Sequence, residues 1–277
     1  KPYREHRIYK TLEAMVPNGF TFSRPVEFAL SLGESEDFPF RFSPSPLCIA
    51  YSGGLKKLQE LAALLRELAK ESGYFDFYQT QATFYTPYIQ QARETVCAHP
   101  FISMLEAEFG TQQHAYYYVI SALMKGNFGL HFPCGERSES ELFSVFSTDS
   151  LSLSPAILLH EYMHAFINPL TEKYRSLVCA FQSAYQWLSK YKLPDYQSGY
   201  GDWEECVNEH LVRAMTIHLL HRCGYSDLAQ KMLRNDLYCG YQYIPLLLER
   251  YCIYDANRGT YSDFEHYYPE LLQVFSA

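Results

Sequence analysis

The sequence contains no closely spaced pair of cysteines. Its eight Cys residues are never nearer to one another than 13 positions; they stand at 48, 97, 134, 179, 206, 223, 239 and 252. This spacing excludes zinc-ribbon knuckles and thioredoxin-type redox pairs. Buried free cysteines are common in chains of this length, so the thiols alone do not require disulfides.

Basic clusters and long apolar runs are also missing. The 23 Lys and Arg are outnumbered by 31 Asp and Glu, the formal net charge is −8, and the longest basic run is Lys56-Lys57. These features argue against nucleic acid or an anionic membrane as the main partner. No apolar stretch approaches the roughly 18 residues of a membrane span. The 48% hydrophobic content, with 25 Tyr and 19 Phe, predicts a folded chain with a sizeable core.

Helical periodicity dominates both halves of the chain, and short strand-like segments lie between them. The first half contains a strongly periodic segment from about Leu55 to Glu71, which Gly73 is placed to cap. Aromatic and β-branched segments between about 114 and 148 predict two or three antiparallel strands. From Ser154 onward, the sequence predicts a helix that ends at Asn168-Pro169, followed by helices at about 171–191, 203–222, 227–250 and 262–275.

These patterns predict an α+β fold that is predominantly helical, with a small antiparallel sheet before the helix at Ser154. We expect a mainly helical N-terminal region at 1–112 and a region at 113–277 that forms one compact unit with the functional site.

The segment "LLHEYMHAF" (158–166) places charged and titratable groups in an otherwise apolar helix. At about 100° per residue, His160 and His164 lie one turn apart on one face, with Glu161 beside them. A free carboxylate in a helix that is apolar nearly all round would cost several kcal/mol unless something compensates its charge. The H-E-x-x-H spacing predicts a zinc ion held by both imidazoles, with Glu161 as the general base of a peptidase.

A catalytic zinc normally takes three protein ligands and leaves a fourth position for water. The metzincin continuation is absent, because "AFINPLTEKYR" follows the motif, so a carboxylate from a second helix is the remaining choice. The segment "GDWEECVNEHLVRAM" (201–215) supplies four acids. Glu209 is our first choice, with Asp202, Glu204 and Glu205 as alternatives. His210 lies about 100° round the helix from Glu209 and is not expected to share its metal.

Two further features bear on the chemistry. Arg213 follows Glu209 by one turn, so it can either pair with that carboxylate or stabilise a developing oxyanion. The segment "NFGLHF" (127–132) is a candidate edge strand that would hold an extended peptide by main-chain hydrogen bonds. The alternative interpretation is an ordinary core strand.

The segments "LLHEYMHAFINPL" and "NEHLVRA" resemble a family of uncharacterised zincin-like proteins of gut Bacteroidota, catalogued as a domain of unknown function. The resemblance extends more loosely over most of residues 55 to 275. It implies a gluzincin-type bacterial hydrolase, with His160, His164 and Glu209 as ligands of one zinc ion and Glu161 as the base. It also implies an exported protein, whether periplasmic, cell-surface or secreted. The spacer of 44 residues between His164 and Glu209 is longer than in the best-known gluzincins.

The sequence therefore predicts a zinc-dependent metallopeptidase that acts on a peptide or protein. The alternative is a non-enzymatic module, in which a zincin scaffold serves to bind a surface glycan or a protein partner. A di-iron protein would need Glu-x-x-His twice, and only Glu161 with His164 supplies it. Neither the cleavage preference nor the oligomeric state follows from the sequence.

Overall fold

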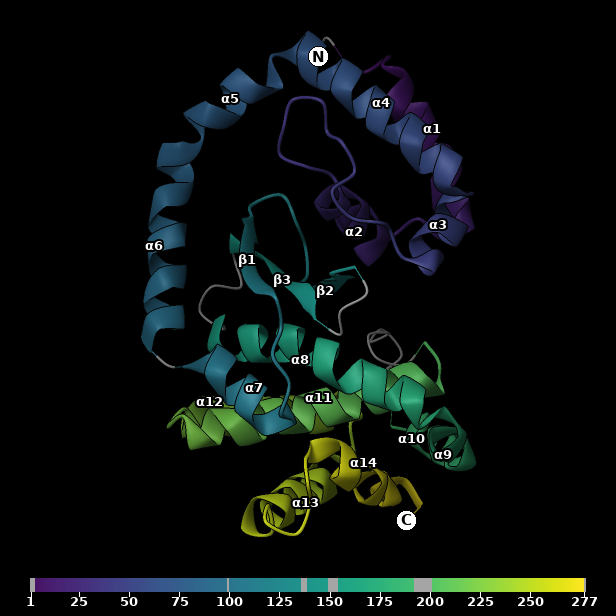
Figure 1. Cartoon of the computed structure of the whole chain (residues 1–277). Helices are drawn as coiled ribbons and strands as arrows, with labels where there is room; N and C mark the ends of the chain where they lie inside the picture. The colour runs from purple at the N-terminus through teal and green to yellow at the C-terminus, as the bar shows by residue number, and fades with distance from the viewer. Residues whose placement is uncertain (1–2, 99, 136–138, 149–153, 192–200, 277) are drawn as a thin grey trace. The chain divides into compact units, whose positions relative to one another are not determined.

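The computed structural model describes residues 3–98, 100–135, 139–148, 154–191 and 201–276 (Figure 1). The chain forms two compact units, Lys1–Gln90 and Gln91–Ala277. The sequence placed a boundary at 112/113, later than this division. The difference arises from α7 (Phe101–Phe109), because Phe101 and Phe109 are buried in the core of the second unit.

The first unit is helical. Its core contains Phe20, Phe28, Leu58 and Leu61, and the amphipathic α4 is closed by Gly73 in the left-handed conformation, as the sequence predicted. Its elements are α1 (Arg7–Met15), η1 (Val16–Asn18), α2 (Ser23–Ser31), α3 (Pro46–Ser52), α4 (Leu55–Ser72) and α5 (Tyr74–Thr80), and α6 (Ala82–Ala98) runs across the division.

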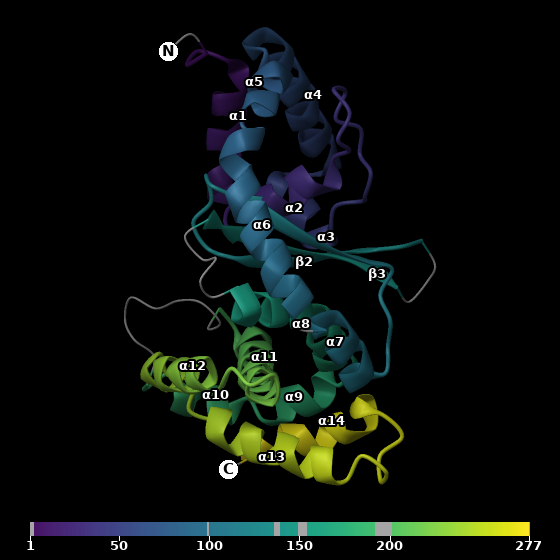
Figure 2. The same cartoon turned by 90° about the vertical axis from the view of Figure 1, so that its left-hand side faces the viewer.

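The second unit is layered. A three-stranded sheet lies on α8, α8 lies on α11, and α13 and α14 cover the far side of α11 (Figures 1 and 2). After α7, the elements are β1 (Ala115–Ser121), β2 (Phe128–Pro133), β3 (Ser140–Ser147), α8 (Ser154–Lys173), α9 (Arg175–Ala180), α10 (Ser183–Leu188), α11 (Trp203–Arg222), α12 (Ser226–Tyr238), α13 (Ile244–Ala256), α14 (Phe264–Leu272) and η3 (Gln273–Ser276).

The sheet is mixed, so the prediction of a purely antiparallel sheet was wrong. The strand order is β1-β3-β2, in which β3 runs parallel to β1 and antiparallel to β2. Seven of the eight residues of β3 are buried, whereas β1 is only partly buried along its whole length. The most buried strand therefore takes the centre, where it has a neighbouring strand on each side.

Asn168-Pro169 does not end α8, contrary to the sequence prediction. The helix continues to Lys173 with Pro169 inside it and exposed to solvent. Its last turn is held by Thr171, which is fully buried and hydrogen-bonds the side chains of Asn208 and Tyr268. These tertiary contacts oppose the loss of one backbone hydrogen bond at the proline.

Two predicted long helices are broken. The segment predicted at 171–191 contains the last residues of α8, followed by α9 and α10. The indole nitrogen of Trp203 donates to the carbonyl of Val178 near the break between α9 and α10, at 2.7 Å. The segment predicted at 227–250 divides into α12 and α13. Between them, Gly240 has φ of +106°, and Pro245 stands in the first turn of α13.

The last predicted helix divides as well. Within the segment predicted at 262–275, α14 ends at Leu272 and the 3-10 helix η3 follows it. The side chain of Asp263 caps α14 by accepting from the backbone N–H of His266.

The two central helices are buried along most of their length. Leu159, Met163 and Ile167 of α8, with Val207 and Leu211 of α11, have no exposed surface. No described helix is both long and apolar enough to cross a bilayer.

Candidate metal centre

The H-E-x-x-H segment lies in the middle of α8, at the partly exposed side of an otherwise buried helix. Leu158, Tyr162 and Met163 are buried in the core, while His160, Glu161 and His164 keep some solvent exposure. The hydroxyl of Tyr162 donates to the backbone carbonyl of Tyr117 at 2.7 Å and thereby fixes α8 against β1. Core packing thus sets the rotation of α8 that presents all three polar side chains on one side.

Asp202 directly precedes the second helix, α11, and its carboxylate accepts from the N–H of Glu205 as the N-terminal cap. Its apolar face, which includes Val207, Leu211 and Ala214, is fully buried. Glu209 is thereby turned toward α8, and its side chain is 13% exposed. A carboxylate of α11 therefore meets two imidazoles of α8 across the contact between the helices.

The three side chains converge on one point. The Nε2 atoms of His160 and His164 are 3.3 Å apart, Glu209 Oε1 is 3.4 Å from His164 Nε2, and Glu209 Oε2 is 3.8 Å from His160 Nε2. Tetrahedral zinc, with bonds of about 2.1 Å to nitrogen and oxygen, separates neighbouring ligand atoms by about 3.4 Å. The donor set and its spacing therefore fit one divalent zinc ion.

The electrostatics of the three groups suit metal binding. Burial lowers the pKa of His160 to about 3, which keeps its imidazole neutral. Burial also acts to lower the pKa of His164, but the adjacent Glu209 outweighs it and the pKa lies above its ordinary value. For Glu209, burial would raise the pKa, but Arg213 and the two imidazoles hold it well below the usual range. Glu209 therefore stays ionised and supplies a carboxylate ligand, while His160 supplies a neutral imidazole.

Glu161 lies beside this cluster without belonging to the group of three. Burial raises the pKa of its carboxyl to about 7, against the opposing effects of His164, Arg213 and a hydrogen bond from the N–H of Gly129. Strand β2 approaches α8 closely here, because a Cβ on Gly129 would stand well under 3.0 Å from the backbone carbonyl of Glu161. Only glycine permits this approach of strand to helix.

Arg213 holds the carboxylate of Glu209. Its Nε donates to Glu209 Oε2 and its Nη1 donates to Asp236 Oδ1, both at 2.9 Å. Its guanidinium also lies 4.3 Å from the ring centre of Tyr241. The sequence left two roles open for Arg213, namely pairing with Glu209 or stabilising an oxyanion. This geometry favours the first, in which Arg213 orients the carboxylate of Glu209.

Asn168 orients the imidazole of His164 in a similar way. Its Oδ1 is 3.3 Å from His164 Nδ1, on the side of the ring opposite to the converging Nε2 atom. A proton on Nδ1 leaves Nε2 with a free lone pair for a metal.

The structure does not bring the alternative acids into the cluster. Asp202 caps α11. Glu204 pairs with Arg175 at 3.0 Å. The carboxylate of Glu205 accepts from the N–H of Gly201 at 3.0 Å. His210 is fully buried, and its Nδ1 lies 2.8 Å from the carbonyl oxygen of Cys206. Among these candidates only Glu209 contacts both motif histidines.

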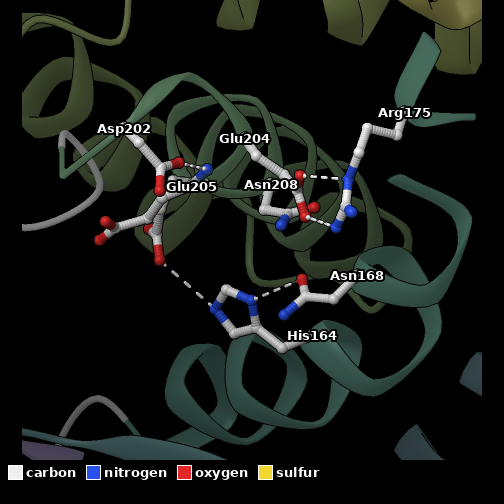
Figure 3. Close-up of a pocket in the computed structure, with 8 residues that line it drawn as sticks. His164, Asn168, Arg175, Asp202, Glu204, Glu205 and Asn208 are labelled. Carbon is white, nitrogen blue, oxygen red and sulfur yellow. Dashed lines mark hydrogen bonds and ion pairs between the residues drawn. The ribbon is translucent and has the colours of Figure 1, made fainter. Parts of the chain in front are cut away.

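A pocket of about 380 Å³ opens beside the cluster (Figure 3). His164 and Asn168 border it from α8, and Glu204 and Asn208 border it from α11, with Asp202 just before that helix. Arg175, Glu205 and Glu209 complete its lining. The pocket is polar and predominantly acidic, and it gives solvent and a small ligand access to His164 and Glu209.

Three residues of the site were not found from the sequence. Asn168 was assigned to the end of the helix, although its position four residues after His164 places both on one face. Glycine inside the segment 127–132 was the available signal for a close backbone approach at Gly129. Asp236 is separated from Arg213 by 23 positions, and no local pattern links them.

Comparison with known proteins gives one match. The family model described as a domain of unknown function, DUF4932, covers residues 1–274. No curated protein and no solved structure matches the chain.

Proposed function

The chain belongs to the DUF4932 family, and we propose that it is a zinc-dependent metallopeptidase whose metal centre is formed by His160, His164 and Glu209. This proposal agrees with the expectation of a zincin-like, gluzincin-type hydrolase. We also expect it to act outside the cytoplasm of a gut bacterium, as the resemblance implies.

One observation carries the proposal. The two Nε2 atoms and the Glu209 carboxylate are separated by 3.3, 3.4 and 3.8 Å, close to the edges of one face of a zinc tetrahedron. Two imidazoles and one carboxylate form the ligand set of thermolysin-type catalytic zinc, which retains an open position. The pocket beside His164 lies where a substrate would reach such a position.

When bound there, zinc would lower the pKa of a water molecule and polarise the carbonyl group of a peptide bond. Glu161 then acts as the general base, because its carboxylate lies next to the ligands without being one of them. It takes one proton from the attacking water and delivers it to the nitrogen of the leaving amine. The hydrogen bond from Gly129 orients the carboxylate for both transfers.

In this proposal, strand β2 holds the substrate. Within the described residues it pairs only with β3, so its other side is an edge of the sheet. Since Gly129 of this strand lies against Glu161, a peptide aligned along β2 would pass next to the base.

The decisive variant is Glu161→Gln. We expect the purified wild type to bind zinc and to cleave members of a mixed peptide library, with cleavage detected by mass spectrometry. Loss of the general base should reduce hydrolysis by about 10²- to 10⁴-fold while zinc content stays unchanged. The matched control is Glu249→Gln, which alters an exposed carboxylate on α13 and should retain full activity.

Two results would contradict the proposal. If His160→Ala left the zinc content of the folded protein unchanged, the metal centre would be wrongly assigned. If the zinc-loaded wild type cleaved no peptide, the non-enzymatic alternative, a module that binds a glycan or a protein partner, would replace the peptidase.

A further inference from the structure

A second group of metal-ligating side chains lies at one end of the sheet. His114 directly precedes β1, Cys134 directly follows β2, and Glu141 is the second residue of β3. Because β1 and β3 are parallel and β2 is antiparallel to β3, the starts of β1 and β3 meet the end of β2. The strand order therefore gathers three residues from distant parts of the sequence.

The backbone around these residues is fixed by hydrogen bonds. The N–H of His114 donates to the carbonyl of Ser140, and the N–H of Cys134 donates to the carbonyl of Glu139, both at 3.0 Å. Glu141 is paired on both sides within the sheet, with Ala115 and Phe132 as its partners in register. The three side chains thus project from an ordered backbone.

Their ligand atoms are close together. One imidazole nitrogen of His114, the sulfur of Cys134 and a carboxylate oxygen of Glu141 all lie within 4.8 Å of one another. Tetrahedral zinc would separate a thiolate, an imidazole and a carboxylate by about 3.4–3.6 Å, so side-chain movements of about 1 Å complete the site. Glu141 is buried, Cys134 is half-buried and His114 is exposed, so the group is open to ions from one side.

We propose that His114, Cys134 and Glu141 bind a second zinc ion, which ties together the ends of the three strands. The thiolate and imidazole favour zinc over magnesium or calcium, which prefer oxygen ligands alone. Binding releases the thiol proton, since the thiolate is the ligand. The carboxylate of Glu139 lies 3.9 Å from His114 Nδ1 and adds a negative charge beside the site.

This site is independent of the centre on α8 and α11 and is tested separately. Reduced protein is dialysed against zinc, and its metal content is measured by mass spectrometry. Cys134→Ala should lose about one equivalent of zinc relative to wild type, and so should His114→Ala. The matched control is Cys252→Ala, which removes an exposed thiol on α13 and should lose none. Circular dichroism verifies that each variant is folded.

Cobalt distinguishes the two centres, because only this one contains a thiolate. The cobalt-loaded wild type should show the near-ultraviolet charge-transfer absorption of a cobalt thiolate. The absorption should persist in His160→Ala and disappear in Cys134→Ala. Absence of this absorption in wild type, or unchanged zinc content in both folded variants at His114 and Cys134, would overturn the proposal. Loss of zinc in His160→Ala alone would support the peptidase centre and not this one.

Discussion

At the scale of single residues, the proposed metal centre depends on the surroundings of its ligands. His160 is kept neutral by burial, whereas His164 and Glu209 are oriented by Asn168 and Arg213. Such partners fix the ring that donates a lone pair and the carboxylate that carries the charge. Their removal should weaken metal binding more than it weakens the fold.

Asn168→Ala is the simplest test of this idea. The variant removes the oxygen that lies 3.3 Å from His164 Nδ1, so the ring is free to rotate or change tautomer. We expect zinc affinity to fall by about 10- to 100-fold, measured by competition with a chelator. Asn257→Ala, which alters an exposed residue at the C-terminal end of α13, is the control and should keep wild-type affinity. Equal losses in both variants would contradict a specific role for Asn168.

At the scale of elements, the distance between β2 and α8 determines where Glu161 lies relative to the edge strand. Gly129 permits that distance, because any side chain there would meet the backbone of α8. Main-chain atoms of a helix cannot rotate away as the end of a flexible side chain can.

Gly129→Ala should therefore separate the strand from the helix. We expect a loss of about 1–3 kcal/mol in the free energy of unfolding, measured by urea denaturation, because the new methyl group overpacks the contact. Peptide hydrolysis should fall by more than the small unfolded fraction explains, since Glu161 loses its hydrogen bond. Gly259→Ala, where an added Cβ meets nothing within 4 Å, should change neither quantity. A fully active Gly129→Ala would show that the close approach has no role in catalysis.

The sequence predicted the elements that carry local signals. The periodicity of α4, the spacing of His160 and His164 on α8 and the acids at the start of α11 all follow from neighbours a few positions apart. Strand order did not follow, because the pairing of β3 between β1 and β2 depends on which strand is covered on both faces. The helix end at Pro169 was misplaced for a related reason, since tertiary contacts of Thr171 outweigh local propensity there. The break at Gly240 did carry a local signal, a glycine followed by Pro245, which the sequence prediction did not use.

At the scale of the whole molecule, two separate hydrophobic cores correspond to the two units. The core of the first unit lies between Ile8 and Leu64, and the core of the second lies between Phe101 and Phe275. All residues of the proposed metal centres belong to the second unit. The stability of that unit therefore determines whether α8 and α11 stay aligned.

A charged network joins three helices of the second unit. Glu108 of α7, whose side chain is 2% exposed, accepts from Arg222 at the end of α11 and from Arg258. Asp255 of α13 accepts from Arg258 and lies 2.7 Å from His218 of α11. Breaking one member of such a network leaves the remaining charges with fewer partners in a partly buried place.

Asp255→Asn tests the network through its dependence on pH. Burial acts to raise the pKa of Asp255, but hydrogen bonds from Arg258 and His218 outweigh it, so the pKa in the folded state is lower than in the unfolded chain. A carboxyl with a lowered pKa stabilises the fold above its unfolded pKa, and this contribution is lost as the pH falls through the folded pKa. At pH 7 we expect the variant to lose about 1.5–3 kcal/mol of unfolding free energy. The difference from wild type should shrink below about pH 4, where the wild-type carboxyl also becomes protonated.

Urea denaturation from pH 3 to 7 measures both quantities, and Asp227→Asn, an exposed site on α12, is the control. A difference that stayed constant across this range would show that the charge of Asp255 does not stabilise the contact between α11 and α13.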